Sequence, residues 1–325
     1  MYKIMYKIDL KDKKILYQLD INSRQSLTQI GKKVGLPKNV VLYRIKKLEK
    51  EGIIKNFHTV INAHKLGYTI LRFYFKYQYI TPRIKEEIID YFIKSNYTTI
   101  VHTIEGRYDL AIYIFIENIT EFYSFWQKTL SLYRDYFTEQ VLSFYIEEDL
   151  YDFASVFFEK KTKRKVKKVF GGKKPVKVDN IDKKIIRIIG PNARISANEI
   201  AKEIGISAVT VSNRIKRLKE KGIIQWFKTN IDFAKLGYRW YKVDIVLRNH
   251  KKIKQIINYI SENPKFVCLD KTIGYVDLEL EFLFKNINEL HQTMEDLSKK
   301  FPDTIRNYNF VYVVETHKYR YLPSN

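Results

Sequence analysis

The chain has 325 residues, of which 45% are apolar, and its 59 Lys and Arg against 36 Asp and Glu give a net charge of +23. This length and apolar content exclude a disordered chain and allow more than one domain. The single cysteine, Cys268, excludes an internal disulfide and a cysteine-rich metal site.

The strong positive charge favours a polyanionic partner, namely DNA, RNA or an acidic membrane surface. A general enrichment in lysine would give the same net charge. Only the placement of the charged residues can therefore distinguish a polyanion-binding protein from a compositional bias. The longest uninterrupted apolar run, residues 110–116, is too short to span a bilayer. The N-terminal residues 1–4 lack the apolar segment of a signal peptide. We therefore expect a cytoplasmic protein without a membrane partner.

The first predicted unit is a helix-turn-helix. Residues 26–29, Ser-Leu-Thr-Gln, form a capping box, in which the serine oxygen accepts a helical amide and the glutamine reaches back. Gly35 occupies the tight turn, where a positive φ is needed. The next helix is expected over residues 38–50, with an apolar stripe of Val41, Ile45 and Leu48.

A strand and an exposed helix face complete this first unit. Gly52 caps the third helix, and the alternating residues 55–61 predict a short β-wing. An α-helix fits the DNA major groove, so the outward helix face is available for base edges and phosphates. We assign to DNA contact Lys38, Asn39, Tyr43, Lys46 and Lys47, and to phosphate contact or helix orientation Arg44.

The pattern changes to strands and helices after Tyr68. Strands are predicted over residues 73–79, 98–104, 110–116 and 141–146, and helices over 82–94 and 119–136. The order βαββαβ predicts an α+β sandwich with its helices on one face of the sheet. The strand aromatic residues favour core packing, with base stacking as the alternative.

A basic linker is predicted after this module, over residues 159–177. At ~3.3 Å per residue it could reach ~60 Å, and its like charges keep it extended. It acts either as a phosphate tether that raises non-specific affinity or as a solvated spacer. Its Gly-Gly-Lys-Lys stretch is not a P-loop, because the distant first glycine and the following Ser or Thr are missing.

The second half of the chain repeats the first. Residues 9–68 lie without a gap over residues 179–238, with 26 identities in 60 positions. Such repetition predicts a duplicated architecture. The capping box recurs at 196–199, the turn glycine is Gly205, and the third helix spans 208–220. Its outward face predicts DNA contacts by Thr210, Ser212, Asn213, Lys216 and Arg217, with Arg214 in the place of Arg44.

The second sheet module keeps the order of the first. Strands are predicted over 240–247, 266–273, 278–284 and 308–315, and helices over 251–261 and 287–300. We therefore expect an α+β chain in which two winged helix-turn-helix domains alternate with two βαββαβ, ferredoxin-like domains. The predicted boundaries are 1–65 and 178–235 for the heads, 66–158 and 236–325 for the α+β domains, and 159–177 for the linker.

The outward faces of the two third helices differ. The first has Pro37, Leu42 and Tyr43 where the second has Ser207, Ser212 and Asn213. Since these side chains offer different groups to base edges, the two heads are predicted to read different half-sites.

The sequence contains no clear motif for catalysis or metal binding. The six histidines are scattered, and no nucleotide-binding glycine pattern follows a strand. Asp109 and Asp277 fit a role in stabilising turns better than a role as paired catalytic acids. We therefore assign no catalytic residue, no metal site and no cofactor.

The motifs of both halves resemble the Lrp/AsnC family of prokaryotic transcription regulators. The resemblance is carried by residues 182–186, 200–201, 205–207, 211–218, 222–224 and 236–238, and more loosely by their counterparts in the first half. It implies that the βαββαβ module is the family's RAM domain, which pairs through its sheet. It also implies a small-molecule effector, often an amino acid, near a Gly-x-x-Asp turn, formed here by Gly106, Asp109, Gly274 and Asp277.

The fusion departs from the family, whose members usually carry one head and one RAM domain. An internal pseudo-dimer or a homo-oligomer is therefore expected, with double-stranded DNA as the partner. Helices 38–50 and 208–220 would enter major grooves, with the wings and the linker on phosphates. Pairing of the RAM domains would set the spacing of the heads.

Two alternatives share this architecture. Siroheme decarboxylases resemble it, but their His-Asn-Tyr segment with a nearby Arg is replaced here by Val-His-Thr at 101–103 and Val-Cys-Leu at 267–269. A chromatin-coating protein would use the same heads without sequence preference. We expect a DNA-binding transcription regulator and no enzyme.

Overall fold

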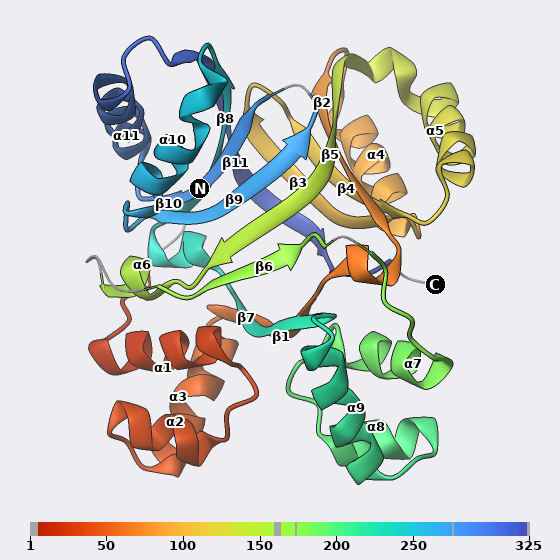
Figure 1. Ribbon diagram of the computed structural model, residues 1–325, viewed down its shortest axis with the longest axis vertical. Helices are drawn as coiled ribbons and strands as arrows, with labels where there is room; N and C mark the ends of the chain where they lie inside the picture. The colour runs from red at the N-terminus through yellow and green to blue at the C-terminus, as the bar shows by residue number, and fades with distance from the viewer. Residues whose placement is uncertain (1–5, 159–163, 173, 275, 324–325) are drawn as a thin grey trace.

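The computed structural model describes residues 6–158, 164–172, 174–274 and 276–323. The predicted linker residues 159–163 and 173, and Tyr275 of the second predicted turn, lie outside this part. Two small helical heads lie side by side at one end of the molecule, and a strongly curved sheet flanked by helices forms the other end (Figure 1).

Each head has three helices, and the second and third form the predicted helix-turn-helix. The first head contains α1 (Leu10–Ile21), α2 (Leu27–Val34) and α3 (Lys38–Lys50), and the second contains α7 (Asn180–Ile189), α8 (Ala197–Ile204) and α9 (Ala208–Glu220). Both predicted capping boxes are formed, at Ser26 and Ser196. Gly35 and Gly205 end α2 and α8 at φ 68° and 74°, because a left-handed turn is cheap for glycine.

The strands predicted as wings exist but pair in an unexpected way. β1 (Ile54–Ile61) and β7 (Ile224–Ile231) form a two-stranded antiparallel ribbon in which His58 lies opposite Lys228. Most residues of both strands are buried. Each strand therefore uses its polar edge and its apolar side chains to join the two heads, and the expectation that the wings also contact phosphates stays a prediction.

The two α+β modules have the predicted βαββαβ order. In the first half these elements are β2 (Thr69–Tyr77), α4 (Pro82–Lys94), β3 (Thr98–Gly106), β4 (Leu110–Ile116), α5 (Ile119–Tyr133) and β5 (Phe137–Tyr151). In the second half they are β8 (Arg239–Leu247), α10 (Ile253–Ser261), β9 (Phe266–Ile273), β10 (Leu278–Phe284), α11 (Ile287–Lys300) and β11 (Ile305–Tyr319). Short 3-10 turns lie at Ala63–Leu66, Arg134–Tyr136, Phe233–Leu236 and His250–Lys252.

The two modules join into one sheet. In the described part of the chain its order is β2-β4-β3-β11-β8-β10-β9-β5-β6, and β2 also pairs with β5, so eight antiparallel strands close into a barrel. β5 and β11 pair with their own half at one end and with the other half at the other end. The chain is therefore an intramolecular pseudo-dimer with an internal twofold relation.

Part of the predicted linker is also folded. Residues Val166–Phe170 form β6, which pairs with β5, and a short helix, α6 (Ala154–Phe158), precedes it. Val169 and Phe170 are buried. The many lysines of this run predict an extended spacer. The free edge of β5 and the burial of two apolar side chains outweigh that charge repulsion.

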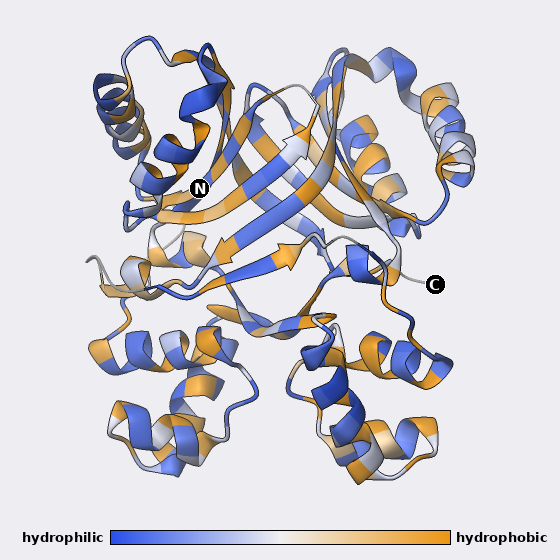
Figure 2. Cartoon of the chain, in the orientation of Figure 1, coloured by the Kyte–Doolittle hydropathy of each residue, from blue (hydrophilic) through white to orange (hydrophobic). Residues whose placement is uncertain are grey.

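The apolar residues form separate layers. Phe73 and Phe75 of β2 pack beneath α4 and α5 in one cluster, and the second module has an equivalent cluster beneath α10 and α11. This arrangement confirms core packing, rather than base stacking, for the strand aromatic residues, and the inward helix faces are apolar in Figure 2. Among the described residues, no helix combines the length and apolar character needed to cross a membrane.

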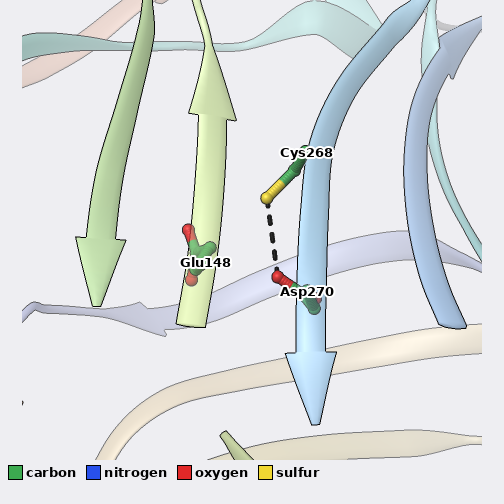
Figure 3. A group of neighbouring side chains, drawn as sticks. All are labelled: Glu148, Cys268 and Asp270. Carbon is green, nitrogen blue, oxygen red and sulfur yellow. Dashed lines mark hydrogen bonds between the residues drawn. The ribbon is translucent and has the colours of Figure 1, made fainter. Parts of the chain in front are cut away.

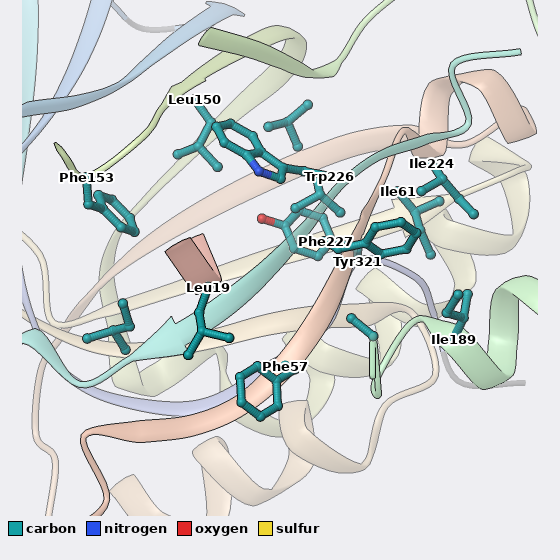
Figure 4. Packing of buried hydrophobic residues seen from close by; sticks show 14 of the residues in the cluster. Leu19, Phe57, Ile61, Leu150, Phe153, Ile189, Ile224, Trp226, Phe227 and Tyr321 are labelled. Carbon is teal, nitrogen blue, oxygen red and sulfur yellow. The ribbon is translucent and has the colours of Figure 1, made fainter. Parts of the chain in front are cut away.

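A third cluster joins the heads to the barrel. Figure 4 shows Phe57 of β1 and Trp226 and Phe227 of β7 beside Leu150 of β5 and the C-terminal Tyr321. The ribbon is therefore packed against both the heads and the barrel.

Candidate nucleic-acid interface and interior cavity

The two recognition helices lie at the end of the molecule farthest from the barrel (Figure 1). The predicted contact residues on them are exposed: Lys38, Asn39, Tyr43, Lys46, Lys47, Thr210, Ser212, Asn213, Lys216 and Arg217. No other module of the described chain covers these faces. The structure therefore brings the predicted residues into two exposed surfaces, one on each head.

Arg44 and Arg214 occupy equivalent, half-buried positions. The Arg44 guanidinium lies 2.7 Å from carboxylate oxygens of both Asp9 and Asp12. Arg214 makes the corresponding contacts to Asp179 and Asp182 at 2.7 and 2.8 Å, and its hydrogen bond holds the pKa of Asp179 below its ordinary value. Of the two roles predicted for these arginines, the contacts support orientation of the recognition helix against the first helix.

Arg217 is shared between the head and solvent. Its Nη2 donates to Asp182 Oδ2 at 2.8 Å, while 45% of its side chain remains exposed. No sequence pattern indicated this contact, because Asp182 lies 35 residues earlier. A base contact by Arg217 would have to compete with a buried carboxylate.

Reciprocal hydrogen bonds lock the heads together. Arg24 Nη1 donates to the carbonyls of Ala193 and Ile195 at 2.6 and 2.8 Å. Arg194, its counterpart at the offset of 170, donates to the carbonyl of Ser23 at 2.5 Å. Each guanidinium also lies over a phenylalanine of the ribbon, Phe227 or Phe57.

Backbone and lysine contacts follow the same symmetry. The amide of Ser23 donates to Phe227, and that of Ala193 donates to Phe57, at 2.9 and 2.8 Å. Lys65 Nζ donates to the carbonyl of Lys221, and its counterpart Lys235 donates to that of Glu51. The spacing of α3 and α9 is thus set within one chain.

The predicted effector residues lie at two junctions between the halves. A Cβ on Gly106 would meet the Phe310 carbonyl of β11 at 2.5 Å, and one on Gly274 would meet the Leu142 carbonyl of β5 at 2.7 Å. Asp109 and Asp277 each accept a backbone amide at the end of a strand, from Tyr77 and Leu247. These contacts are structural, and the proposed effector role stays a prediction.

A cavity lies between the barrel and the β1–β7 ribbon, away from the predicted effector residues. Its volume is about 710 Å³, and both halves line it. His102 of β3 and Cys268 of β9, which occupy equivalent strands of the two modules, both face it. These two positions do not indicate a cavity in the sequence, because the cavity forms only when the two halves pair. Charged residues that alternate with apolar ones on a buried strand, such as Glu279 and Glu281 of β10, could have indicated a polar interior.

Acidic side chains stand in a row across the barrel wall near this cavity. Glu148 of β5 is paired with Asp270 of β9, and Asp270 is paired with Glu279 of β10. Like charges on directly opposite strand positions repel each other. The buried cations that oppose them are Arg72, whose Nη2 lies 2.7 Å from Glu279 Oε1, and Lys242, which contacts Asp270, Glu279 and Glu281.

The pKa values within this row follow from burial and charge. Burial raises the pKa of Asp270 to about 7, although Lys242 opposes the shift. Burial and the neighbouring Asp270 raise the pKa of Glu148 well above its usual range. Burial would also raise the pKa of Glu279, but Arg72 and Lys242 bring it down to about 2. Burial therefore favours the protonated forms of Glu148 and Asp270, whereas Arg72 and Lys242 favour the ionised form of Glu279.

Glu148, Cys268 and Asp270 form a compact group within the row (Figure 3). Their oxygen and sulfur atoms lie within 4.8 Å of one another, as metal ligands would. Burial and the adjacent carboxylates raise the pKa of the Cys268 thiol, and its Sγ donates to Asp270 Oδ1 at 3.5 Å. Since metals bind the thiolate, we assign no metal to this group.

Two neutral imidazoles line the same cavity. Burial lowers the pKa of His58 to about 3 and that of His102 to about 4. In the described part of the chain, the Nδ1 atoms of both rings are buried without a hydrogen-bond partner. Buried polar atoms are usually satisfied by protein, water or ligand, so the cavity offers unused hydrogen-bonding capacity.

These features define a class of protein: paired helix-turn-helix heads with exposed basic helices, carried on paired α+β modules. Winged helix-turn-helix DNA-binding domains match residues 8–55 and 178–225. The chain is 39% identical over 113 residues to the HTH-type transcriptional regulator Ptr1 of Methanocaldococcus jannaschii, covering 76% of that protein and 35% of this chain. It is 30% identical over 118 residues to the regulatory protein AsnC of Haemophilus influenzae, covering 79% of that protein and 36% of this chain.

The chain therefore belongs to the Lrp/AsnC family of transcription regulators, with the family's unit duplicated in tandem. The siroheme decarboxylase NirDL has a similar fold over the whole length. Its structure covers 96% of this chain and 94% of its own, with a TM-score of 0.64 and 15% sequence identity. That likeness confirms the predicted architecture of two heads and two ferredoxin-like modules.

Proposed function

We propose that this protein regulates transcription by placing α3 and α9 of a single chain in two major-groove segments of one DNA duplex. The observation that carries the proposal is the position of the two basic recognition helices, which are exposed at one end while every contact that fixes their spacing is internal. The relatives that share its heads are named as transcriptional regulators.

The residues of the two faces divide by chemistry. Asn39, Tyr43, Thr210 and Asn213 carry the groups that suit base edges. Lys46, Lys47 and Lys216 suit phosphates, which position the protein and supply the salt-dependent part of the affinity. Arg44 and Arg214 hold the recognition helices through their aspartate pairs.

The proposed operator is asymmetric. The hydrogen bonds between the two heads are nearly symmetric. The recognition helices differ, however, because Tyr43 faces outward at the position that Asn213 occupies in the other head. We expect selection from random duplexes to recover two different half-sites at one fixed spacing. Recovery of a symmetric site would contradict this part of the proposal.

The readout is tested by Asn213→Ala. Loss of a bidentate base contact should weaken binding to the selected duplex by roughly 1–3 kcal/mol and relax preference at one position. Asn258→Ala, which removes the same group from an exposed position on α10, is the control and should leave the affinity unchanged. Equal affinities of wild type and Asn213→Ala in a fluorescence anisotropy titration would rule out this readout.

A footprint separates regulation from chromatin coating. A site-specific regulator protects discrete segments of genomic fragments, whereas a coating protein gives uniform protection. We expect discrete protection, since specific contacts add to the non-specific phosphate term.

A tetrapyrrole enzyme is the second candidate function. It is favoured by the full-length fold likeness to a siroheme decarboxylase and by the cavity, which reaches His102 and Cys268. The regulator fits better, because the tripeptides at 101–103 and 267–269 lack the expected His-Asn-Tyr segment. A Soret-like absorbance change on adding a porphyrin, together with no DNA binding, would reverse this ranking.

A further inference from the structure

The exposed apolar side chains of the two heads are concentrated on the recognition helices. Among the described residues of the heads, five large apolar or aromatic side chains are exposed. One of them lies on α1 and the other four lie on α3 and α9: Leu10, Val40, Leu42, Tyr43 and Val209. The faces that the heads present to DNA therefore offer apolar groups as well as polar ones.

Val209 is the most exposed of the four side chains on the recognition helices, at 70%. It is the second residue of α9. Residues three, four and seven positions apart share one face of a helix, so Val209 lies on one stripe with Ser212, Asn213 and Lys216. All four side chains are exposed, and the buried residues of α9 lie on another face. Val209 is thus the apolar member of the outward stripe of α9.

Neither helix formation nor core packing favours a valine at this position. A β-branched side chain loses rotamer freedom in a helix, and an exposed side chain gains little from burial of apolar surface. The helix begins at Ser207, whose hydroxyl accepts the amide of Thr210 at 3.1 Å, so the cap does not depend on Val209. Its apolar surface becomes buried only when a partner covers this face.

We propose that Val209 recognises a thymine of the second half-site by contact with the C5-methyl group of the base. In the major groove this methyl group is the apolar feature that distinguishes thymine, and apolar side chains contact it. The N-terminal residues of a recognition helix contact the base edges, and Val209 lies in the first turn of α9. The inference rests on the proposed function, because it names a base that the second head selects.

The first head carries a different chemical group at the equivalent position. Asn39 occupies this position, at the offset of 170 residues, and an asparagine side chain pairs with the N6 and N7 groups of adenine. Since the hydrogen bonds between the heads are nearly symmetric, equivalent residues face equivalent positions of the two half-sites. We therefore expect adenine in the first half-site where the second has thymine.

Replacement of thymine by deoxyuridine tests the contact, because it removes the methyl group and leaves every hydrogen-bonding group in place. Each thymine of the duplex recovered by selection is replaced in turn, and the affinity of the full chain is measured by fluorescence anisotropy. We expect one thymine of the second half-site to respond with a loss of roughly fourfold, the effect of one buried methyl group.

Val209→Ala should abolish the response to deoxyuridine at that thymine and leave the responses at other positions unchanged. The variant should fold, because alanine favours a helix more than valine does. Val166→Ala makes the same change on β6, at a side chain that is 45% exposed and lies outside the heads, and it should keep the full response. Equal responses of Val209→Ala and the wild type would overturn the proposal.

Failure of this inference and failure of the proposed function give different results. If binding showed no sequence preference and Asn213→Ala bound as tightly as the wild type, the proposed function would fail, and the thymine contact with it. If binding were specific and Asn213→Ala weakened it, but no thymine responded to deoxyuridine in a way that Val209→Ala abolished, only the thymine contact would be wrong.

Discussion

The pair His58 and Lys228 shows how the duplicated halves have diverged at single residues. The two residues lie opposite each other where β1 meets β7. Lys228 Nζ pairs with Asp20 at 2.5 Å, but the residue equivalent to Asp20 in the second half is Gly190. Among the described residues His58 therefore has no acidic partner, and it is buried between the Lys228 charge and the rings of Tyr319 and Tyr321.

This environment predicts that acidification destabilises the protein through His58. Burial, with a smaller effect of Lys228, lowers its pKa from the ordinary 6.5 to about 3. The stability that depends on neutral His58 is present above pH 6.5 and is lost as pH falls towards 3, since the unfolded chain binds the proton first. Between pH 7 and pH 5 the loss is about 2 kcal/mol.

Urea denaturation at pH 7 and pH 5 measures this contribution. His58→Phe keeps a ring but cannot bind the proton, so its free energy of unfolding should fall by about 2 kcal/mol less than that of the wild type. His250→Phe, at an exposed site, is the matched control and should behave as the wild type. A His58→Phe protein with the full pH dependence would show that another group is responsible.

At the scale of single elements, the helices and strands followed from local signals. The predicted strands at 110–116, 266–273 and 278–284 and the helices at 82–94 and 287–300 have the bounds of the structure. Capping boxes, turn glycines and regular apolar spacing define such elements with residues close in sequence. The pairing of the two wing strands with each other and the folding of β6 within the predicted linker were not predicted, because the partner strands are remote in the chain.

The hydrogen bonds of Arg24 and Arg194 to the opposite head predict that these two residues fix the distance between α3 and α9. Replacing both Arg24 and Arg194 by Met should remove two charged donors, each worth roughly 1.5–3 kcal/mol, and loosen the heads. The wild type should bind one half-site spacing much better than a duplex lengthened by two base pairs. In the double variant we expect this preference to shrink severalfold.

Arg83→Met with Arg248→Met removes the same charge from exposed positions and is the control for this comparison. Its spacing preference should match that of the wild type. If the Arg24/Arg194 variant kept the full preference, the ribbon alone would set the spacing.

At the scale of the whole molecule, duplication places a complete dimer-like body in one chain. The barrel closes through β3 with β11 and through β5 with β9, so both halves share one sheet. One chain therefore presents two heads whatever the protein concentration. Association into a homo-oligomer through the RAM-like domains stays a prediction.

The salt dependence of DNA binding should measure the phosphate contacts that both heads of one chain make. Each phosphate contact that is removed should reduce the slope of log K against log salt by about 1. We expect Lys46→Ala with Lys47→Ala to lower the slope by about 2 while one chain still binds each duplex. Lys251→Ala with Lys254→Ala, two exposed lysines near and on α10, should leave the slope unchanged, and equal slopes in both variants would contradict the assignment of the first head.

The sequence by itself determined the duplication, the helix-turn-helix heads, the order of the α+β modules and the exposed residues of α3 and α9. Each of these depends on caps, turns and periodicities that act over a few residues. The tertiary structure alone decided the β1–β7 ribbon, the closed barrel, the arginine lock and the cavity. These features join residues from opposite halves of the chain, whose contact depends on how two complete halves pack and not on any local pattern.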